Sequence, residues 1–485
     1  MAKNLMIQGT MSGVGKSILT AGILRVLRQD GFRCVPFKSQ NMALNSFVTE
    51  EGREIGRAQA LQAAAAGVKP SADMNPILLK PLGEKRSSLV LLGKPEGNYT
   101  AAEYFRRKKD YLPLILSAYE RLTKEADIVV IEGAGSPVEI NLKENDIVNM
   151  GLAKLLDAPV LLVGNIDPGG VFAQLLGTIE LMTGEERARV RGLVINRFRG
   201  DLELLSPGLT QFKRWCSIPF AGVVPFLPLS LDEEDSLSDR LHKKPELSAD
   251  CLKLTVVRFP YISNCSDFTA LDQTPGVEVI YTEDPDMLER SDLILLPGTR
   301  RTIEDLKWMK EKGLFDRILK LHGQGCPVLG ICGGLQMLGR TISDEVGAEN
   351  GGSGEGLSLL PVDTRFRREK KLCQTEGRLG SLSGFFAPLS DTPVKGYEVH
   401  QGDSGIEDEL VITKDRVLGT FLHGFFDSAV LRERLLKLLF EEKGKKLPPL
   451  SLEEASVCRE KELDRLAEVL RERLDWELIY RSIGI

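Results

Sequence analysis

A glycine-rich stretch near the start of the chain constrains the fold more than any other feature. Residues 9–17 read G-T-M-S-G-V-G-K-S. A short apolar segment, Leu5 to Gln8, precedes it, and a run with apolar residues at helical spacing, Ser17 to Arg28, follows it. Glycines allow consecutive backbone N–H groups to face inward, and the helix adds its positive amino-terminal end. The stretch therefore predicts a phosphate-binding loop in a nucleotide-binding α/β domain.

The loop differs in spacing from the common phosphate-binding motif. Five residues separate Gly9 from Gly15, where the common motif has four. The prediction therefore depends on the strand before the loop and the helix after it, and a glycine-rich turn that binds nothing is the alternative. Lys16 is expected to reach the outer phosphates of ATP, and Ser17 to bind Mg²⁺. The residues assigned to the nucleotide are Thr10, Ser12, Gly13, Val14, Gly15, Lys16 and Ser17.

A magnesium site of this kind needs a second oxygen ligand. Residues 127–136 read D-I-V-V-I-E-G-A-G-S, which places Glu132 at the carboxyl end of a buried strand. Ligands bind at that edge of an open parallel sheet, so Glu132 is the expected acidic partner of the metal. Lys38 follows another short strand, C-V-P-F, and is expected at the same edge, where it could neutralise phosphoryl charge. A solvated strand-end glutamate and a surface lysine are the plain alternatives.

The order of apolar segments predicts two α/β domains. Strand-like segments alternate with helical stretches, which indicates parallel sheets with helices on both faces. The expected strands are 5–8, 34–37, 128–131, 159–163 and 192–195 in the first series, and 254–257, 277–281, 293–296 and 328–331 in the second. A charged, serine-rich stretch with two prolines separates the series. We expect an ATP-binding domain at 1–226, a linker at 227–251, a second domain at 252–440 and a helical tail at 441–485.

A cysteine in the second domain has the surroundings of a nucleophile. Residues 328–339 read V-L-G-I-C-G-G-L-Q-M-L-G, so Cys332 stands between a short strand and a helical segment, with Gly330 and Gly334 on either side. Small neighbours permit the strained turn that exposes a nucleophile above a sheet, and the helix terminus lowers the pKa of a thiol. Backbone N–H groups near Gly333 and Gly298 could hold an oxyanion. A buried structural cysteine is the alternative.

A thiol nucleophile requires a base, which is normally histidine. The chain has four histidines, namely His242, His322, His400 and His423. His242 lies in the expected linker, and His322 near the end of a predicted helix. His423, in L-G-T-F-L-H-G-F-F, follows a strand-like run in the same domain as Cys332 and is the preferred base. His400, in G-Y-E-V-H-Q-G, is the second candidate and could instead shape a glutamine pocket.

Composition excludes several classes of protein. The formal net charge is −6 with both signs interspersed, which argues against a nucleic-acid partner. Eight cysteines without C-x-x-C spacing suggest neither a disulfide framework nor a zinc site. The first residues lack the features of a signal peptide, and no apolar run is long enough to span a membrane. A cytoplasmic enzyme with small-molecule substrates is therefore expected.

Long stretches of this sequence resemble the cobyric acid synthase family of corrinoid amidotransferases. In the first half they include P-F-K-S-Q-N-M-A-L-N-S (36–46), D-M-N-P-I-L-L-K-P (73–81), I-E-G-A-G-S-P-V-E-I-N-L (131–142) and D-I-V-N-M-G-L-A (146–153). In the second half they are G-I-C-G-G-L-Q-M-L-G, G-Y-E-V-H-Q-G and G-T-F-L-H-G-F-F. The first domain is also similar to dethiobiotin synthetase, and the second to class I glutamine amidotransferases, which implies a flavodoxin-like α/β fold for the latter.

The resemblance implies a substrate and a set of roles. Such enzymes amidate the b, d, e and g carboxylates of adenosylcobyrinic acid a,c-diamide, with glutamine as the nitrogen donor and ATP and Mg²⁺ as cofactors. By similarity, Cys332 is the nucleophile and His423 its base, Gln336 contacts glutamine, Asn196 contacts the adenine ring and Lys38 serves the phosphoryl transfer.

One residue departs from the wider amidotransferase pattern. That pattern reads H-P-E, and its glutamate orients the histidine, whereas this chain has H-G-F with Phe425 in that position. The resemblance therefore leaves open which group orients His423. Two other functions also stay open at this point. One is the related a,c-diamide synthase, and the other is a partitioning-type nucleotide switch whose second domain is idle.

Overall fold

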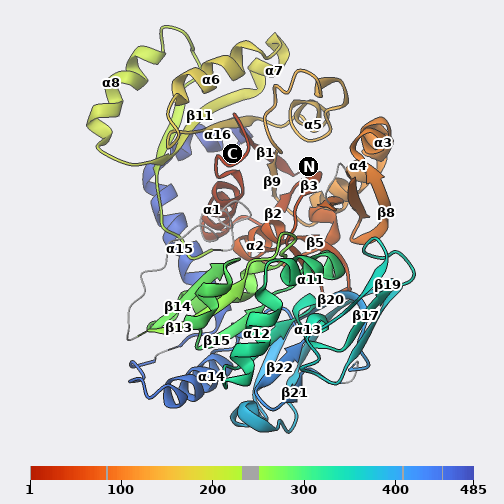
Figure 1. Cartoon of the computed structure of the whole chain (residues 1–485). Helices are drawn as coiled ribbons and strands as arrows, with labels where there is room; N and C mark the ends of the chain where they lie inside the picture. Colours follow the sequence, from red (N-terminus) through yellow and green to blue (C-terminus); the bar gives the residue numbers. More distant parts are fainter. Residues whose placement is uncertain (1, 83–85, 232–250, 407–408, 451) are drawn as a thin grey trace. The chain divides into compact units, whose positions relative to one another are not determined.

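The computed structural model describes residues 2–82, 86–231, 251–406, 409–450 and 452–485 of the chain (Figure 1). Most of the expected linker, together with His242, lies outside the described residues. The first of two compact units contains the described parts of Met1–Thr49, Arg53–Asp235 and Arg459–Ile485. The second contains those of Glu50–Gly52 and Ser236–Cys458.

A six-stranded, fully parallel sheet forms the centre of the first unit, in the order β12-β11-β10-β1-β9-β2. Its strands are β1 (Lys3–Gly9), β2 (Cys34–Phe37), β9 (Ile128–Glu132), β10 (Val160–Asn165), β11 (Val190–Phe198) and β12 (Phe220–Pro225). All five strands predicted for this series are confirmed. The unpredicted strand β12 extends the sheet at one edge.

Helices cover both faces of this sheet, as the alternation of side chains requires. Leu5 and Ile7 belong to one apolar cluster, and Met6 between them belongs to the other. The first cluster includes residues of α1 (Lys16–Gln29), α2 (Arg57–Ala66), α15 (Ala455–Arg473) and α16 (Trp476–Ile483). The second includes residues of α4 (Leu112–Thr123), α5 (Met150–Leu155), α6 (Val171–Glu180) and α8 (Leu202–Phe212).

A small mixed sheet between β2 and α4 was not predicted from the sequence. It has the order β3-β6-β7-β8, with strands Gln40–Met42, Ile77–Pro81, Arg86–Leu91 and Lys94–Thr100, and the hairpin β4 (Ser46–Val48) and β5 (Glu54–Gly56) lies in the same stretch of chain. Strands β3 and β8 consist mainly of polar residues, and β6 and β7 contain only short apolar runs, so apolar alternation does not mark this sheet. Lys80 forms a buried ion pair with Glu54 and donates to Ser46 Oγ at 3.0 Å.

The carboxyl-terminal helices α15 and α16 pack against the first unit. Arg25 of α1 pairs with Glu460 and Asp464 of α15, at 2.7 Å in each case. A Cβ placed on Gly22 of α1 would lie 2.3 Å from a methyl carbon of Leu470, so the two helices approach closely there. Helices α15 and α16 lie within the helical tail expected at 441–485, but from Arg459 onwards they belong to the nucleotide-binding unit. Their apolar stripe needs a partner, and α1 supplies it.

The second unit is built on another six-stranded sheet, with the order β14-β13-β15-β16-β22-β21. Its strands are β13 (Leu252–Val257), β14 (Val277–Thr282), β15 (Leu293–Leu296), β16 (Val328–Ile331), β21 (Ile412–Lys414) and β22 (Val417–Thr420), and only β21 pairs antiparallel to its neighbour. The four predicted strands of this series are confirmed. Its helices include α11 (Thr302–Glu311), α12 (Leu314–Gly323), α13 (Gly333–Leu338) and α14 (Ala429–Glu442).

A second mixed sheet, in the order β18-β17-β19-β20, belongs to the same unit. Its strands are β17 (Thr341–Asp344), β18 (Gly352–Glu355), β19 (Asp363–Arg378) and β20 (Pro393–Asp403), and β19 and β20 form a long antiparallel ribbon. The fold class is therefore α/β with two mainly parallel central sheets, as predicted. Among the described residues, none of the helices is both long and apolar enough to cross a membrane.

Candidate functional site

The glycine-rich loop joins β1 to α1 and has the backbone that its glycines permit. Gly13 and Gly15 have φ values of 74° and 84°, in the left-handed region that glycine adopts at little cost. A Cβ on Gly15 would also lie 2.4 Å from Nδ2 of Asn196, which itself donates to the carbonyl of Val14 at 2.8 Å. Asn196, at the end of β11, therefore braces the loop from the neighbouring strand. Its predicted contact with adenine remains a prediction.

The side chains of the loop are arranged around this backbone. Lys16 is buried, and its amine donates to the carbonyls of Met11 at 3.0 Å and Gly135 at 3.4 Å. Thr10 donates to Oε1 of Gln174 at 3.3 Å, and Ser12 is exposed at the tip. The amine of Lys16 thus lies across the loop, in the region where the phosphates are predicted to bind.

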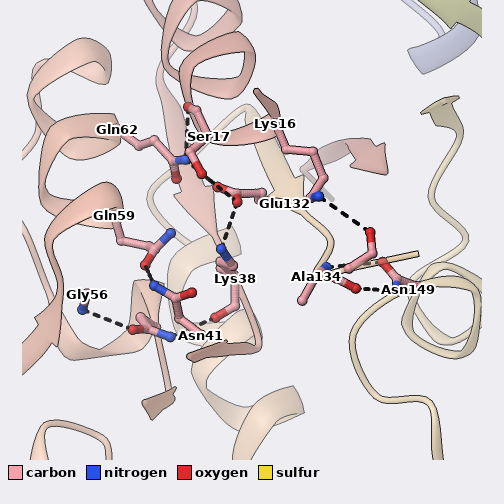
Figure 2. Close-up of polar contacts among 12 residues, drawn as sticks. Lys16, Ser17, Lys38, Asn41, Gly56, Gln59, Gln62, Glu132, Ala134 and Asn149 are labelled. Atoms are coloured by element: carbon pink, nitrogen blue, oxygen red, sulfur yellow. Dashed lines mark hydrogen bonds and ion pairs between the residues drawn. The ribbon is translucent and has the colours of Figure 1, made fainter. Parts of the chain in front are cut away.

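Three side chains, from two helices and one loop, converge on the carboxylate of Glu132 (Figure 2). Ser17 Oγ donates to Oε1 at 2.8 Å, and the amine of Lys38 lies 2.7 Å from the same oxygen. Gln62 of α2 donates to Oε2 at 2.5 Å and to the Ser17 carbonyl at 3.2 Å. The structure therefore brings Ser17, Lys38 and Glu132 together, as their expected positions at one sheet edge require, and adds Gln62.

The charge on Glu132 is maintained by its neighbours. Burial by itself would raise the pKa of this carboxyl group, but the Lys38 amine and the hydrogen bonds from Gln62 and Ser17 lower it below its ordinary range. Glu132 is thus ionised at neutral pH although it is 1% exposed.

The oxygens of Ser17 and Glu132 suit a magnesium ion. Adjacent ligands of an octahedral Mg²⁺ are about 2.9 Å apart, given metal–oxygen distances of about 2.0–2.1 Å. The separation of Ser17 Oγ from Glu132 Oε1, 2.8 Å, fits that geometry. Magnesium typically takes one or two protein oxygens and completes its shell with phosphate and water, so this donor pair is sufficient.

An asparagine that sequence reasoning did not select shapes the loop after β9. Asn149 donates to the carbonyls of Ala134 at 2.6 Å and Ser136 at 3.1 Å, and its Oδ1 accepts from Ala134 N at 3.1 Å (Figure 2). Asp146 in turn accepts backbone N–H groups from residues 148, 149 and 151 at 2.8–2.9 Å. The loop that carries the Gly135 carbonyl toward Lys16 is therefore held by side chains.

In the second unit, Cys332 has the strained backbone of a nucleophile elbow. Its φ is 52° and its ψ −109°, a region that residues with a side chain rarely adopt. A Cβ on Gly334 would lie 2.0 Å from the carbonyl oxygen of Leu296, and one on Gly330 would lie 2.6 Å from the Gly334 backbone. Both flanking glycines are thus required by close backbone packing, which is why they bracket the cysteine.

His423 lies beside this cysteine and is held by a carboxylate. Its Nδ1 is 2.8 Å from Oδ2 of Asp267, and both side chains are 1% exposed. Asn264 Nδ2 lies 3.3 Å from the imidazole, and Tyr397 stacks on it with ring centroids 5.3 Å apart. Burial would lower the pKa of His423, but the Asp267 carboxylate and the interaction with Cys332 raise it above its ordinary range.

The remaining predicted residues of this site lie close by. A Cβ on Gly298 would be 3.3 Å from Cε1 of His423, and one on Gly333 would be 2.6 Å from the Thr299 side chain, so the two glycines flank the elbow. Gln336 is 2% exposed, and its Oε1 lies 3.3 Å from the hydroxyl of Thr302. These placements agree with an oxyanion and glutamine site, whose roles remain predictions.

The other histidines are engaged differently. His400 Nδ1 lies 2.8 Å from the carbonyl of Gly402, and Nε2 lies 3.2 Å from Glu398. Its ring also stacks on Phe421 at a centroid distance of 3.8 Å. His400 is therefore fixed by its own strand and a neighbour, which favours His423 as the base. His322 lies in α12, and the structure does not bring it to this group of residues.

Comparisons with known proteins agree with the geometry of both units. The CobQ/CobB/MinD/ParA nucleotide binding domain matches residues 5–236, and the CobB/CobQ-like glutamine amidotransferase domain matches residues 253–430. Proteins named cobyric acid synthase from Lachnoclostridium phytofermentans, Ruminiclostridium cellulolyticum and Photorhabdus laumondii are 46%, 47% and 44% identical to the chain. They align with 99%, 100% and 100% of it, over 99%, 97% and 98% of their own lengths.

This chain belongs to the cobyric acid synthase family. In this family member, which has H-G-F in place of H-P-E, the structure shows which group contacts His423. Phe425 is completely buried in the apolar core, and Asp267, which lies in the short 3₁₀ helix Cys265–Phe268 after β13, contacts the imidazole instead. Sequence reasoning missed Asp267 because it is 156 residues away from His423 and no local pattern marks it.

Sequence reasoning also missed two cations that interact with the thiol of this cobyric acid synthase family member, Arg300 and Lys370, and a carboxylate that interacts with both, Glu349. Arg300 interacts electrostatically with Glu349 and Cys332, and Lys370 interacts with Arg300, Cys332 and Glu349. Burial, followed by the effect of Arg300, lowers the pKa of Lys370 to about 7. Burial also raises the pKa of Glu349 to about 7 and lowers that of Arg300 to about 10.

Proposed function

We propose that this chain converts adenosylcobyrinic acid a,c-diamide to cobyric acid by amidating its b, d, e and g carboxylates with glutamine and ATP. The observation that carries this proposal is the full-length identity to cobyric acid synthases, together with a thiol, an imidazole and a carboxylate in one group. Family membership supports glutamine-dependent amidation in cobalamin biosynthesis, and the particular carboxylates are the proposed part.

In the second unit, Cys332 Sγ attacks the carboxamide carbon of glutamine. His423 takes the thiol proton and delivers it to the departing nitrogen, so that ammonia leaves and a thioester remains. Water then attacks the thioester, with His423 as the base, and glutamate leaves. Asp267 keeps the imidazole in one orientation and stabilises its charged form, which is the role of the third group in such arrangements.

In the first unit, a substrate carboxylate attacks the γ-phosphorus of ATP, and ADP leaves. Ammonia attacks the resulting acyl phosphate and displaces inorganic phosphate, which forms the amide. Lys16 and Lys38 neutralise charge on the transferring group. Ser17 and Glu132 would hold Mg²⁺, which spreads phosphoryl charge when it is bound.

The direct test is to incubate the full chain with the diamide, glutamine and MgATP and to weigh the products. Conversion of four carboxylates to amides is expected, and each conversion lowers the mass by about 1 Da. If cobyrinic acid gained two amides while the diamide did not react, the chain would be an a,c-diamide synthase. If a glutamine-analogue electrophile failed to label Cys332, the amidotransferase role would be excluded, as expected for a nucleotide switch with an idle second unit.

A further inference from the structure

The side-chain amide of Gln62 contacts both residues that are expected to bind magnesium. It donates to Glu132 Oε2 at 2.5 Å and to the carbonyl of Ser17 at 3.2 Å (Figure 2). We propose that Gln62 is a positioning residue that makes Glu132 a one-oxygen ligand, and that the site thereby selects Mg²⁺ over Ca²⁺. This inference rests on the proposed function, since it concerns the metal that accompanies ATP.

The orientation of this amide is determined by its two partners. Both are acceptors, one a carboxylate oxygen and the other a carbonyl oxygen, so only the NH₂ end of the Gln62 side chain can face them. That end has two hydrogens, and the two contacts use both of them. Gln62 therefore connects the end of β9 to the start of α1, where the two expected metal ligands stand.

The two oxygens of the Glu132 carboxylate have different partners. Oε1 lies 2.8 Å from Ser17 Oγ and 2.7 Å from the amine of Lys38, whereas Oε2 accepts from Gln62. Rotation of the carboxylate would withdraw Oε2 from a buried hydrogen bond, which is costly. Gln62 therefore keeps Oε1 beside Ser17 Oγ, at the spacing expected of adjacent magnesium ligands.

Gln62 is itself held in place by the packing of α2. The residue is completely buried, and α2 reads R-A-Q-A-L-Q-A-A-A-A. The helix packs against α1 through Leu61, Ala65 and Ala66, which belong to the same apolar cluster as the buried residues of α1. Small alanine side chains allow this close approach, so the position of the Gln62 backbone is determined by apolar contacts.

The start of α2 is anchored separately, to the segment that carries Lys38. Gly56, which precedes the helix, donates its N–H to Asn75 Oδ1 at 3.0 Å, and Asn75 Nδ2 donates to the carbonyl of Lys38 at 3.2 Å (Figure 2). A Cβ on Gly56 would lie 2.5 Å from Oε1 of Gln59, so this approach is also close. Loss of the Gln62 amide should therefore leave the helix where it is.

The two cations differ in the carboxylate geometry that they accept. Adjacent octahedral positions around Mg²⁺ are about 2.9 Å apart, which is wider than the spacing of the two oxygens in one carboxylate. Ca²⁺ has a larger and more flexible shell and accepts both oxygens of one carboxylate. A Glu132 side chain whose Oε2 is occupied by Gln62 offers a single oxygen, which suits Mg²⁺. Without the amide, Oε2 is free to join Oε1 on Ca²⁺.

The test measures how tightly the full chain binds the non-hydrolysable analogue β,γ-imido-ATP with excess Mg²⁺, with excess Ca²⁺ or with EDTA. Isothermal titration calorimetry gives the three dissociation constants, and the wild-type chain is expected to favour Mg²⁺. Gln62→Met keeps an unbranched side chain but removes the amide. It is expected to weaken binding with Mg²⁺ by about 10- to 100-fold, the usual effect of losing a group that orients a metal ligand. Binding with Ca²⁺ should weaken much less, and binding in EDTA should not change.

A matched control lies one helical turn earlier in α2. Gln59 is as buried as Gln62, but its Oε1 accepts from Asn41 Nδ2 at 3.1 Å. Gln59→Met is therefore expected to keep the wild-type preference for Mg²⁺. Gln62→Asn, which keeps the amide but shortens the side chain by one carbon, should lose part of the preference. It provides a second variant if thermal unfolding shows that Gln62→Met is poorly folded.

The ratio of the Ca²⁺ and Mg²⁺ dissociation constants decides between the outcomes. A fall in this ratio for the Gln62 variants, but not for Gln59→Met, supports the assignment. A wild-type ratio in the Gln62 variants, or an equal loss of affinity under all three conditions, would overturn it, because Gln62 would then only support the fold. If neither metal tightened binding to the wild-type chain, the proposed magnesium site itself would be wrong, and the inference with it.

Discussion

The two candidate sites of this chain are built on the same kind of turn, but different residues adopt positive φ there. Each lies at a turn from a parallel strand into a helix, β1 to α1 in the first unit and β16 to α13 in the second. At the first turn the residues with positive φ are glycines, Gly13 and Gly15, whereas at the second the residue is Cys332. Backbone N–H groups face the ligand in a phosphate loop, while an elbow must present a side chain.

The two sites differ in backbone strain and in how their charged groups are stabilised. The phosphate loop avoids strain because glycine has no Cβ, and its carboxylate, Glu132, is ionised by Lys38 and hydrogen-bonding neighbours. At the elbow the strained residue is Cys332 itself. The residues on either side, Gly330 and Gly334, are glycines because a Cβ at either position would collide with neighbouring backbone. A phosphate site therefore depends on backbone freedom, and a thiol site depends on close packing around one rigid residue.

The largest expected effect distinguishes the cysteine site of the second unit from the nucleotide site of the first. Cys332→Ser should lower glutamine-driven amidation at least about 10³-fold and leave amidation from ammonium salts intact. Lys16→Ala should abolish both, since ATP chemistry is common to them. Product formation with each nitrogen source is the measurement, and equal losses in the two variants would contradict the division of labour.

Removing the carboxylate that holds the imidazole should have the next largest effect. Asp267→Asn is expected to reduce glutamine hydrolysis by about 10²- to 10⁴-fold, because the imidazole loses both its orientation and the charge that raises its pKa. The exposed Asp286→Asn serves as the control. Wild-type hydrolysis in the Asp267 variant would show that another group orients His423.

Adding one methyl group at each turn should show that the cysteine elbow depends on close packing and the phosphate loop on backbone freedom. Gly334→Ala is expected to destabilise the second unit by about 3 kcal/mol or more, because its Cβ would meet the Leu296 carbonyl at 2.0 Å. Gly15→Ala, at φ 84° and with its Cβ 2.4 Å from Nδ2 of Asn196, should cost about 1–3 kcal/mol and chiefly weaken ATP binding. Thermal unfolding and nucleotide titration measure the two effects, and the reverse order would refute the contrast.

The helices α15 and α16 should stabilise only the nucleotide-binding unit. Leu470→Ala removes a fully buried side chain that packs on α1, with an expected cost of about 2–5 kcal/mol. Ammonium-driven amidation should therefore lose thermal stability, while labelling of Cys332 by a glutamine analogue keeps its wild-type temperature range. A parallel loss of both would show that the units unfold together.

Much of the fold followed from local sequence patterns. The central strands of both sheets and helix α1 were predicted because apolar runs and helical spacing mark them directly. The sheet β3-β6-β7-β8 was missed because β3 and β8 are mainly polar and the apolar runs of β6 and β7 are short. Cys332 and its glycines were recognisable because the turn depends on adjacent residues.

The sequence by itself determined the two α/β units, the glycine loop and the cysteine elbow, because backbone conformation depends on neighbouring residues. Only the tertiary structure decided the partners of the reactive groups. Asp267 reaches His423 across 156 residues, and Lys38 reaches Glu132 across 94. Those contacts depend on which strands become neighbours in a sheet, and that order is a property of the packed core and not of any single segment.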